Sequence, residues 1–149
     1  MEVDHDAPAV ATSEAAISAA PERVWDVIAD FASWPEWDPN VRFVEIDGPV
    51  EPGTEFRWKA GVTITSRLEE VERPRHLAWT GRTFGVKAAH VWFFERRGDN
   101  TLARTEESWT GFLPRLIRGP MRRTLQRSLD ESLANLAAEV GRRSANGRP

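Results

Sequence analysis

Residues 87 to 110 read KAAHVWFFERRGDNTLARTEESWT, and this stretch decides the fold. Two runs rich in Val, Trp, Phe and Thr flank a Gly98-Asp99 turn, which is the pattern of two antiparallel strands joined by a hairpin. With these two residues at the tip, the register of the hairpin is fixed. One face then carries Trp109 and three cross-strand pairs: Phe94 with Ala103, Trp92 with Thr105, and His90 with Glu107. The stretch therefore predicts an aromatic sheet face that holds one imidazole and one carboxyl as neighbours.

Further strands are predicted before this hairpin. Short runs of Val, Ile, Thr, Trp and Phe alternate with Gly and Pro turns from residue 41 to residue 110. We predict six strands there, over residues 41 to 46, 54 to 60, 62 to 71, 76 to 82, 87 to 97 and 101 to 110, and one earlier strand that ends near Ser18. Because the connections are short, the strands are expected to form an antiparallel meander.

Two short helices are expected between the first strand and residue 41. Pro21 suits a first helical position, and Val24, Val27 and Ile28 follow it at helical spacing. The segment Ser33-Trp34-Pro35-Glu36 has the pattern of a capping box, in which the first side chain accepts from the last residue's amide. This pattern predicts a second small helix directly after the first.

A long amphipathic helix is expected near the C-terminus. After Gly119-Pro120, apolar residues recur at intervals of three or four residues, namely Met121, Leu125, Leu129, Leu133, Leu136 and Val140. The pattern predicts one helix of about 20 residues, which would be about 30 Å long. Its apolar stripe needs a large apolar partner, and the predicted sheet is the one available.

The composition is that of one globular domain. The chain has 149 residues, of which 40% are hydrophobic and 29% charged. The folded body is expected from residue 10 to residue 141, between flexible polar tails at 1 to 9 and 142 to 149. A net charge of -3 argues against a strong overall attraction to nucleic acid or to anionic lipid, and the chain has no apolar run that would predict stable membrane insertion. The absence of Cys excludes disulfides, thiolate zinc sites and thiol nucleophiles, and it fits a cytoplasmic location.

The aromatic composition suggests a cavity. The chain contains 7 Trp and 7 Phe but no Tyr. Alternation along the strands places Trp79 with Leu77, and Phe56 with Trp58, on the same face as the hairpin aromatics. Indole N–H groups need partners and large rings pack with irregular gaps, so we expect a hollow interior lined by Trp. A solid core rich in Trp is the alternative.

The predicted neighbours His90 and Glu107 have two interpretations. The simpler one is a satisfied buried pair with a structural role. In the functional one, apolar surroundings raise the pKa of Glu107 while His90 opposes that change, which leaves a proton donor and an acceptor inside a hydrophobic site. The chain has no phosphate-binding loop, dinucleotide-binding motif or nucleophile elbow, and its His residues lack ligand spacing. We therefore expect neither a metal nor a cofactor.

Five segments together resemble the polyketide cyclase/dehydrase-like branch of the START-related (SRPBCC) superfamily. They are ISAAPERVW at 17 to 25, WPEWDP at 34 to 39, LAWTG at 77 to 81, HVWFFE at 90 to 95 and ESWTG at 107 to 111. The resemblance spans nearly the whole predicted body. It implies an α+β helix-grip fold, in which a curved seven-stranded antiparallel sheet wraps around a long C-terminal helix. Two short helices would close one end, and a hydrophobic cavity would lie between sheet and helix.

The resemblance also implies which residues meet a ligand. Carried over by position, the cavity face includes Trp79, His90, Trp92, Glu107 and Trp109, which is the face that the hairpin register selects. The expected site has Glu107 and His90 as its acid and base. The expected ligand-contacting residues are Trp34, Trp37, Phe56, Trp58, Trp79, Trp92, Phe94, Trp109, Phe112, Leu125 and Leu129.

A basic run lies beside the expected mouth of the cavity. It consists of Arg115, Arg118, Arg122, Arg123 and Arg127, with no acidic residue among them. Such a run is most often a solvated helix face. Alternatively, it attracts a ligand carboxylate, the phosphate of an acyl carrier protein, or anionic lipid during ligand exchange.

Three functions are compatible with these observations. The first is non-covalent binding of a small hydrophobic or aromatic ligand, lipid-like or polyketide-like, in the cavity. The second is catalysis as a polyketide cyclase, aromatase or dehydratase that uses Glu107 and His90. The third is a protein-interaction module with a solid core and no ligand.

Overall fold

The structure is a computed structural model that describes residues 1 to 146. Its elements follow in the order β1 (Ala9–Ile17), α1 (Pro21–Ile28), the 3₁₀ helix η1 (Phe31–Ser33), α2 (Trp34–Trp37), β2 (Phe43–Ile46), β3 (Glu55–Ala60), β4 (Val62–Glu72), β5 (His76–Thr83), β6 (Val86–Arg97), β7 (Asn100–Thr110), α3 (Phe112–Leu116) and α4 (Arg118–Ala145). Each predicted strand is present, with bounds close to those expected.

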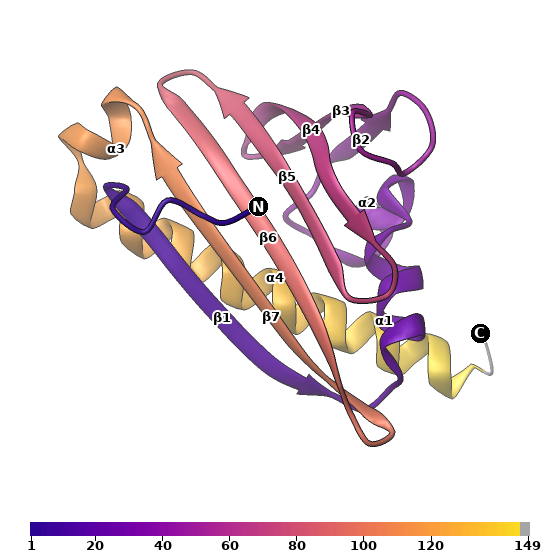
Figure 1. The fold of residues 1–149 in the computed structure, drawn as a ribbon. Coiled ribbons are helices and arrows are strands. Elements are labelled where there is room, and N and C mark those ends of the chain that lie inside the picture. The colour runs from indigo at the N-terminus through magenta and orange to yellow at the C-terminus, as the bar shows by residue number, and fades with distance from the viewer. Residues whose placement is uncertain (147–149) are drawn as a thin grey trace.

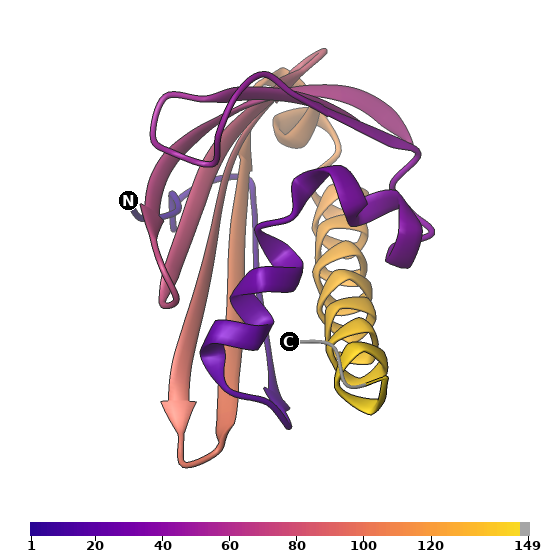
Figure 2. The ribbon, with the colours of Figure 1, turned by 90° about the vertical axis from the view of Figure 1, so that its right-hand side faces the viewer.

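The strands form one curved sheet that is packed against α4. All seven are antiparallel, in the order β1-β7-β6-β5-β4-β3-β2. The long helix runs along the sheet in Figure 1, and Figure 2 shows the strands near β2 bending over it. The short helices α1 and α2 lie on the same side of the sheet as α4 (Figure 2). The expected α+β helix-grip fold is confirmed.

The hairpin of β6 and β7 has the predicted register. His90 is opposite Glu107, Trp92 is opposite Thr105, and Phe94 is opposite Ala103. On the other side of β6, His90 is also opposite Trp79 of β5. These residues share the face that α4 covers, which we call the concave face, and the alternate residues form the outer face.

The helix α4 is longer than the periodicity predicts. It has 28 residues, begins before Gly119-Pro120 and includes Arg142 and Arg143, which the sequence pattern assigns to the tail. Pro120 lies in the first turn, where backbone N–H groups have no partner within the helix, so it does not interrupt the helix. Arg142 and Arg143 both pair with Glu139, which stabilises the last turns. The remainder of the expected tail, residues 147 to 149, lies outside the described residues.

The buried stripe of α4 packs in two separate clusters. Leu133, Leu136 and Val140 belong to the main core, together with α1 and the aromatic residues of the sheet. The earlier Leu125 and Leu129 form a smaller cluster with β1, through Ala9 and Ala11, and with half-buried Trp109 and Met121. Each buried Leu contributes roughly 1.5 to 3 kcal/mol by leaving water.

The first residues of the chain differ from the expected flexible tail over 1 to 9. Val3 is buried against Ala78 and Val91 of the outer face, and Ala7 is also buried. The amino group of Met1 pairs with Glu70, and the amide of Asp4 donates to the hydroxyl of Ser108. The segment is ordered because the outer face of the sheet carries apolar side chains that would otherwise be exposed to water.

The predicted capping box is not formed. Ser33 belongs to η1, and its hydroxyl donates to the carbonyl oxygen of Asp30 instead of accepting from α2. The helix α2 has four residues and continues directly from η1. It is held by the buried indole of Trp34, which donates to the carbonyl oxygen of Ile28 at 2.9 Å. Within residues 1 to 146, no helix has both the length and the apolar composition of a membrane span.

Candidate functional site

A cavity of about 590 Å³ lies between the concave face and α4. Most of its wall is apolar. The sheet contributes residues from β3 to β7, the short helix α2 contributes its two Trp residues, and α3 and α4 contribute Leu113, Met121 and the hydroxyl groups of Thr124, Ser128 and Ser132. The expected hollow interior is therefore present.

Eight of the residues expected at the site line this cavity. They are Trp34, Trp37, Trp58, Trp79, His90, Trp92, Glu107 and Trp109. The hairpin register brings the last four of these together, and α2 and β3 close one end. Trp34 packs against Trp58 and Trp79 with ring centroids 5.5 and 5.6 Å apart. The Trp residues thus build a solid aromatic cluster at one end and the wall of a cavity beside it.

Five expected ligand contacts do not line the cavity. Phe56 is enclosed by other rings, with its centroid 4.9 Å from that of Phe31. Phe94 is buried at the other end of β6, edge-on to Trp25. Leu125 and Leu129 turn toward β1, as described above. Phe112 is half exposed at the surface. The alternation of apolar residues along a strand, or an apolar stripe along a helix, identifies the buried face of the element. It does not show which part of that face lines a cavity and which part packs in the core.

The pair predicted by the hairpin register is formed on the cavity wall. His90 Nδ1 lies 3.2 Å from Glu107 Oε1, and His90 Nε2 lies 2.8 Å from the hydroxyl of Thr105. That hydroxyl donates to the carbonyl oxygen of Val91 at 3.2 Å, so it accepts from Nε2–H. His90 is then neutral with a free lone pair on Nδ1, which accepts a hydrogen bond from the protonated Glu107 carboxyl. The indole of Trp109 donates to Glu107 Oε2 at 2.7 Å.

Burial changes the protonation of both groups. It raises the pKa of the Glu107 carboxyl to about 7, although the hydrogen bond from Trp109 acts in the opposite direction. Burial also lowers the pKa of the His90 imidazole to about 3. Near neutral pH the cavity therefore contains a neutral imidazole beside a partly protonated carboxyl group. The effect that opposes burial at Glu107 comes from Trp109 and not from His90, which differs from the expectation. The arrangement is compatible with both the structural and the functional interpretation of the pair.

The cavity contains a second carboxyl group, which the periodicity of the sequence does not predict. Asp38 follows α2, is 5% exposed and lines the cavity. Burial raises its pKa, against hydrogen bonds from the Asn40 amide at 3.0 Å and the Asn135 side chain at 3.3 Å. The segment Asp38-Pro39-Asn40 is a turn pattern in which the Asp side chain accepts from the backbone two residues later, and this pattern is the available clue.

The mouth of the cavity is marked by the lining residues that are exposed. They are Asn40, Gly61, Val62, Arg82, Phe84, Ile117, Pro120, Thr124 and Ser128. Most of these residues come from the turn between β3 and β4, the turn between β5 and β6, and the first part of α4. Sequence reasoning did not identify Phe84, although a large apolar residue beside a turn glycine is an unusual feature.

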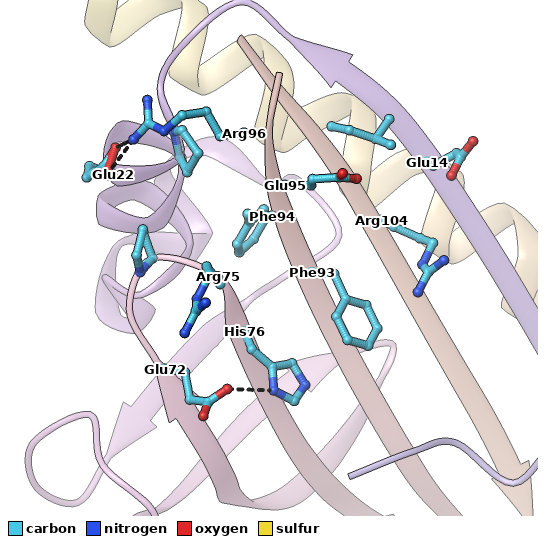
Figure 3. A pocket seen from close by; sticks show the side chains of 13 residues that line it. Glu14, Glu22, Glu72, Arg75, His76, Phe93, Phe94, Glu95, Arg96 and Arg104 are labelled. Atoms are coloured by element: carbon cyan, nitrogen blue, oxygen red, sulfur yellow. Dashed lines mark hydrogen bonds and ion pairs between the residues drawn. The ribbon is translucent and has the colours of Figure 1, made fainter. Parts of the chain in front are cut away.

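A second hollow, of about 700 Å³, lies on the outer side of the sheet beside α1 (Figure 3). Two contacts join side chains that line it, Arg96 with Glu22 and His76 with Glu72. Its lining has no apolar enclosure comparable to the Trp wall of the cavity. We therefore take the cavity under α4 as the candidate site.

The sequence matches one family model over residues 8 to 141, and its description is "polyketide cyclase / dehydrase and lipid transport". This chain belongs to that family. The match covers nearly all of the described structure, and it agrees with the resemblance carried by the five sequence segments. No curated protein gives a significant match to the chain.

Three solved structures are similar to this chain over most of its length. The ZhuI aromatase/cyclase of a Streptomyces species is 18% identical, with a TM-score of 0.83 over 94% of this chain and 98% of its own. A hypothetical protein of Helicobacter pylori is 18% identical, with a TM-score of 0.82 over 93% of this chain and 91% of its own. A START superfamily protein of Mycobacterium smegmatis is 16% identical, with a TM-score of 0.76 over 89% and 97%. At these identities the similarity shows a shared fold.

Proposed function

We propose that the protein binds a small, largely apolar and uncharged molecule, aromatic or lipid-like, non-covalently in the cavity under α4. The observation that carries this proposal is the Trp-lined cavity of about 590 Å³, which is open at one mouth. Ligand sites commonly measure about 300 to 1,000 Å³ and combine an apolar wall with a few polar groups. Membership in a family described by polyketide and lipid chemistry supports the same class of ligand.

The polar groups of the wall favour a ligand with hydroxyl groups. Protonated Glu107 donates a hydrogen bond to His90 through one oxygen and accepts a hydrogen bond from Trp109 through the other. Its remaining lone pairs are free to accept from a ligand hydroxyl. Asp38 offers a second acceptor near α2. Arg82 at the mouth is the only Lys or Arg among the described residues that line the cavity, so an anionic group deeper inside would lose its hydration without an opposite charge beside it, which is costly.

A cavity-filling substitution tests the binding proposal. Ala88 lines the cavity from β6, and Ala89 lies next to it on the outer face. Binding of the neutral fluorophore N-phenyl-1-naphthylamine is measured by quenching of Trp emission. Ala88→Phe is expected to weaken binding at least tenfold, whereas Ala89→Phe is expected to leave it unchanged. Unfolding curves of both variants verify that they are folded. Equal binding by both variants, or no quenching in the original protein, would disprove the proposal.

Catalysis is the second candidate, and the Glu107–His90 geometry favours it specifically. A carboxyl with a pKa of about 7 can both remove and return a proton at neutral pH. In an aldol cyclisation, the Glu107 carboxylate would remove a proton from a carbon between two ketones, and that carbon would form a bond to a third carbonyl carbon. The new alkoxide would take the proton back from Glu107, and loss of this hydroxyl with a neighbouring hydrogen as water would complete a dehydration.

Glu107→Gln separates the two candidates. The amide preserves the size of the side chain and its hydrogen bonds, but it does not transfer protons. With a synthetic poly-β-ketone thioester as substrate, a catalyst would lose turnover and keep binding of the fluorophore. Absence of any product from the original protein, with intact fluorophore binding, would assign the protein to binding alone. Glu106→Gln, on the outer face of the same strand, controls for the change in net charge.

A further inference from the structure

The mouth of the cavity is surrounded by exposed apolar side chains. Within residues 1 to 146, the large hydrophobic residues that are exposed are Val62, Phe84, Phe112, Leu116 and Ile117, at 53, 81, 50, 75 and 44%. Three of them, Val62, Phe84 and Ile117, also line the cavity. We call these five residues the mouth patch. The chain thus exposes its large apolar residues at one place instead of scattering them over the surface, and such a patch marks an interaction site.

The mouth patch is assembled from separate segments. Phe84 in the turn after β5 meets Phe112 of α3 edge to face, with ring centroids 5.4 Å apart. Below them the backbones of Gly85 and Gly111 are in direct contact, and a Cβ atom at Gly111 would collide with the carbonyl oxygen of Gly85. Figure 1 shows α3 at the same end of the molecule as the turn between β5 and β6. Close backbone contact therefore holds the exposed rings in place.

Most exposed charges beside the mouth patch are positive. The segments that form the patch, residues 60 to 66, 79 to 90 and 108 to 129, contain 7 of the chain's 20 Lys and Arg residues and none of its 23 Asp and Glu residues. Outside them, the carboxyl of Glu131 accepts a hydrogen bond from Asn40 at the mouth. The exposed cations near the mouth are Arg82, Lys87, Arg115, Arg118 and Arg123. None of these five forms an ion pair within the described part of the chain. The overall charge of -3 therefore conceals a group of unpaired cations beside the mouth patch.

We propose that the mouth patch docks on the surface of an anionic lipid bilayer. The proposal rests on the proposed binding function and names where the ligand is exchanged. Phe84 and Leu116 are the most exposed members, and their apolar side chains would enter the boundary between headgroups and acyl chains. The unpaired arginines would contact anionic headgroups beside them. Because the cavity opens within the patch, an apolar ligand would pass between bilayer and cavity without crossing water.

Vesicle binding tests this proposal without any ligand. Co-sedimentation is measured with vesicles of phosphatidylcholine that contain about 30 mol% phosphatidylglycerol, and with vesicles of phosphatidylcholine alone. We expect binding to the anionic vesicles that weakens when salt rises from about 50 to about 500 mM, because salt screens exposed charges. Absence of binding to anionic vesicles at low salt would overturn the proposal, as would equal binding to both vesicle types.

Matched variants test the surface. Replacing Arg118 and Arg123 by Gln is expected to weaken binding about thirtyfold, which corresponds to about 1 kcal/mol for each arginine. The same replacements at Arg96 and Arg97, at the end of β6 away from the mouth, change the net charge equally and are expected to leave binding within about twofold. Phe84→Ser is expected to weaken binding at least tenfold by removing apolar contact. Equal losses in the two arginine pairs would overturn the proposal.

Two other occupants of the patch would give distinct results. Binding of an acyl carrier protein without binding of vesicles would overturn the proposal, and so would a dimer in sedimentation velocity that Phe84→Ser dissociates. Fluorophore binding in the cavity is measured separately and in the absence of vesicles. Binding of the fluorophore without binding of vesicles would support the proposed function and overturn the docking proposal. Binding of vesicles without binding of the fluorophore would support docking and overturn the proposed function.

Discussion

Glu107→Gln is expected to stabilise the protein at alkaline pH and to be nearly neutral at acidic pH. Burial raises the pKa of Glu107 from 4.5 to about 7. Below pH 4.5 the carboxyl is protonated in the folded and unfolded states alike, so the raised pKa has little effect on stability. As the pH rises toward 7, the unfolded chain releases the proton first, and the folded state is destabilised relative to it. Above about pH 8 the loss is complete.

The magnitude follows from the difference between the two pKa values. At about 1.4 kcal/mol per pKa unit, the full loss is about 3 kcal/mol, of which about 2.5 kcal/mol falls between pH 5 and pH 8. The Gln side chain imitates the protonated carboxyl, because its amide group can donate to His90 Nδ1 and its oxygen can accept from Trp109. The variant therefore does not lose the folding stability that the original protein loses at high pH through Glu107.

The His90 imidazole changes the folding stability with pH in the direction opposite to Glu107. Its lowered pKa means that the unfolded chain gains a proton first as the pH falls below 6.5, which destabilises the folded state at acidic pH. In the original protein the two effects largely cancel between pH 5 and pH 8. The Gln variant retains the His90 effect alone, so its stability should rise visibly over this range.

Urea unfolding at pH 5 and pH 8, followed by Trp fluorescence and by circular dichroism, measures the effect. The free energy of unfolding of Glu107→Gln, relative to that of the original protein, is expected to be higher at pH 8 than at pH 5 by about 2.5 kcal/mol. Glu106→Gln on the outer face is the control for net charge. A relative stability of Glu107→Gln that is equal at the two pH values would refute the assignment of a raised pKa to Glu107, and with it the proton exchange that the catalytic candidate needs.

Two glycines give further predictions. Gly111 has a φ of 115°, and a Cβ atom there would collide with Gly85, so Gly111→Ala is expected to cost more than about 3 kcal/mol in urea unfolding. Gly98→Ala, at a φ of 64° with open space around it, is the control and should cost only about 1 kcal/mol. Gly141 lies inside α4 with nothing within 4 Å, so Gly141→Ala is expected to raise the free energy of unfolding by about 0.5 to 1 kcal/mol, and a lower melting temperature would contradict this.

The sequence contained the parts of the site that depend on register. A tight turn at Gly98-Asp99 fixes which residues of β6 and β7 are opposite each other, so the contact of His90 with Glu107 was predictable. Alternation also placed Trp79 and Trp92 on the correct face. These predictions rely on local backbone geometry, which short-range patterns describe well.

Other parts depend on how the elements pack at long range. The apolar stripe of α4 was recognisable, but its rotation toward Ala9 and Ala11 directs Leu125 and Leu129 away from the cavity. Val3 has no periodic pattern around it, so the sequence did not predict that it is buried on the outer face. Buried Asp38 accepts a hydrogen bond from the Asn135 side chain of α4, a contact between residues distant in the sequence.

The division of the α4 packing into two clusters has a consequence for access to the interior. The second half of the helix is anchored in the main core through Leu133, Leu136 and Val140. The first half, which borders the opening, is held by a smaller apolar cluster, in which Leu125 and Leu129 pack against Ala9, Ala11, Trp109 and Met121. Displacing the first half by bending the helix thus breaks far fewer apolar contacts than unfolding the domain. A ligand that is larger than the opening would therefore enter through a local bend of α4, while the rest of the domain stays folded.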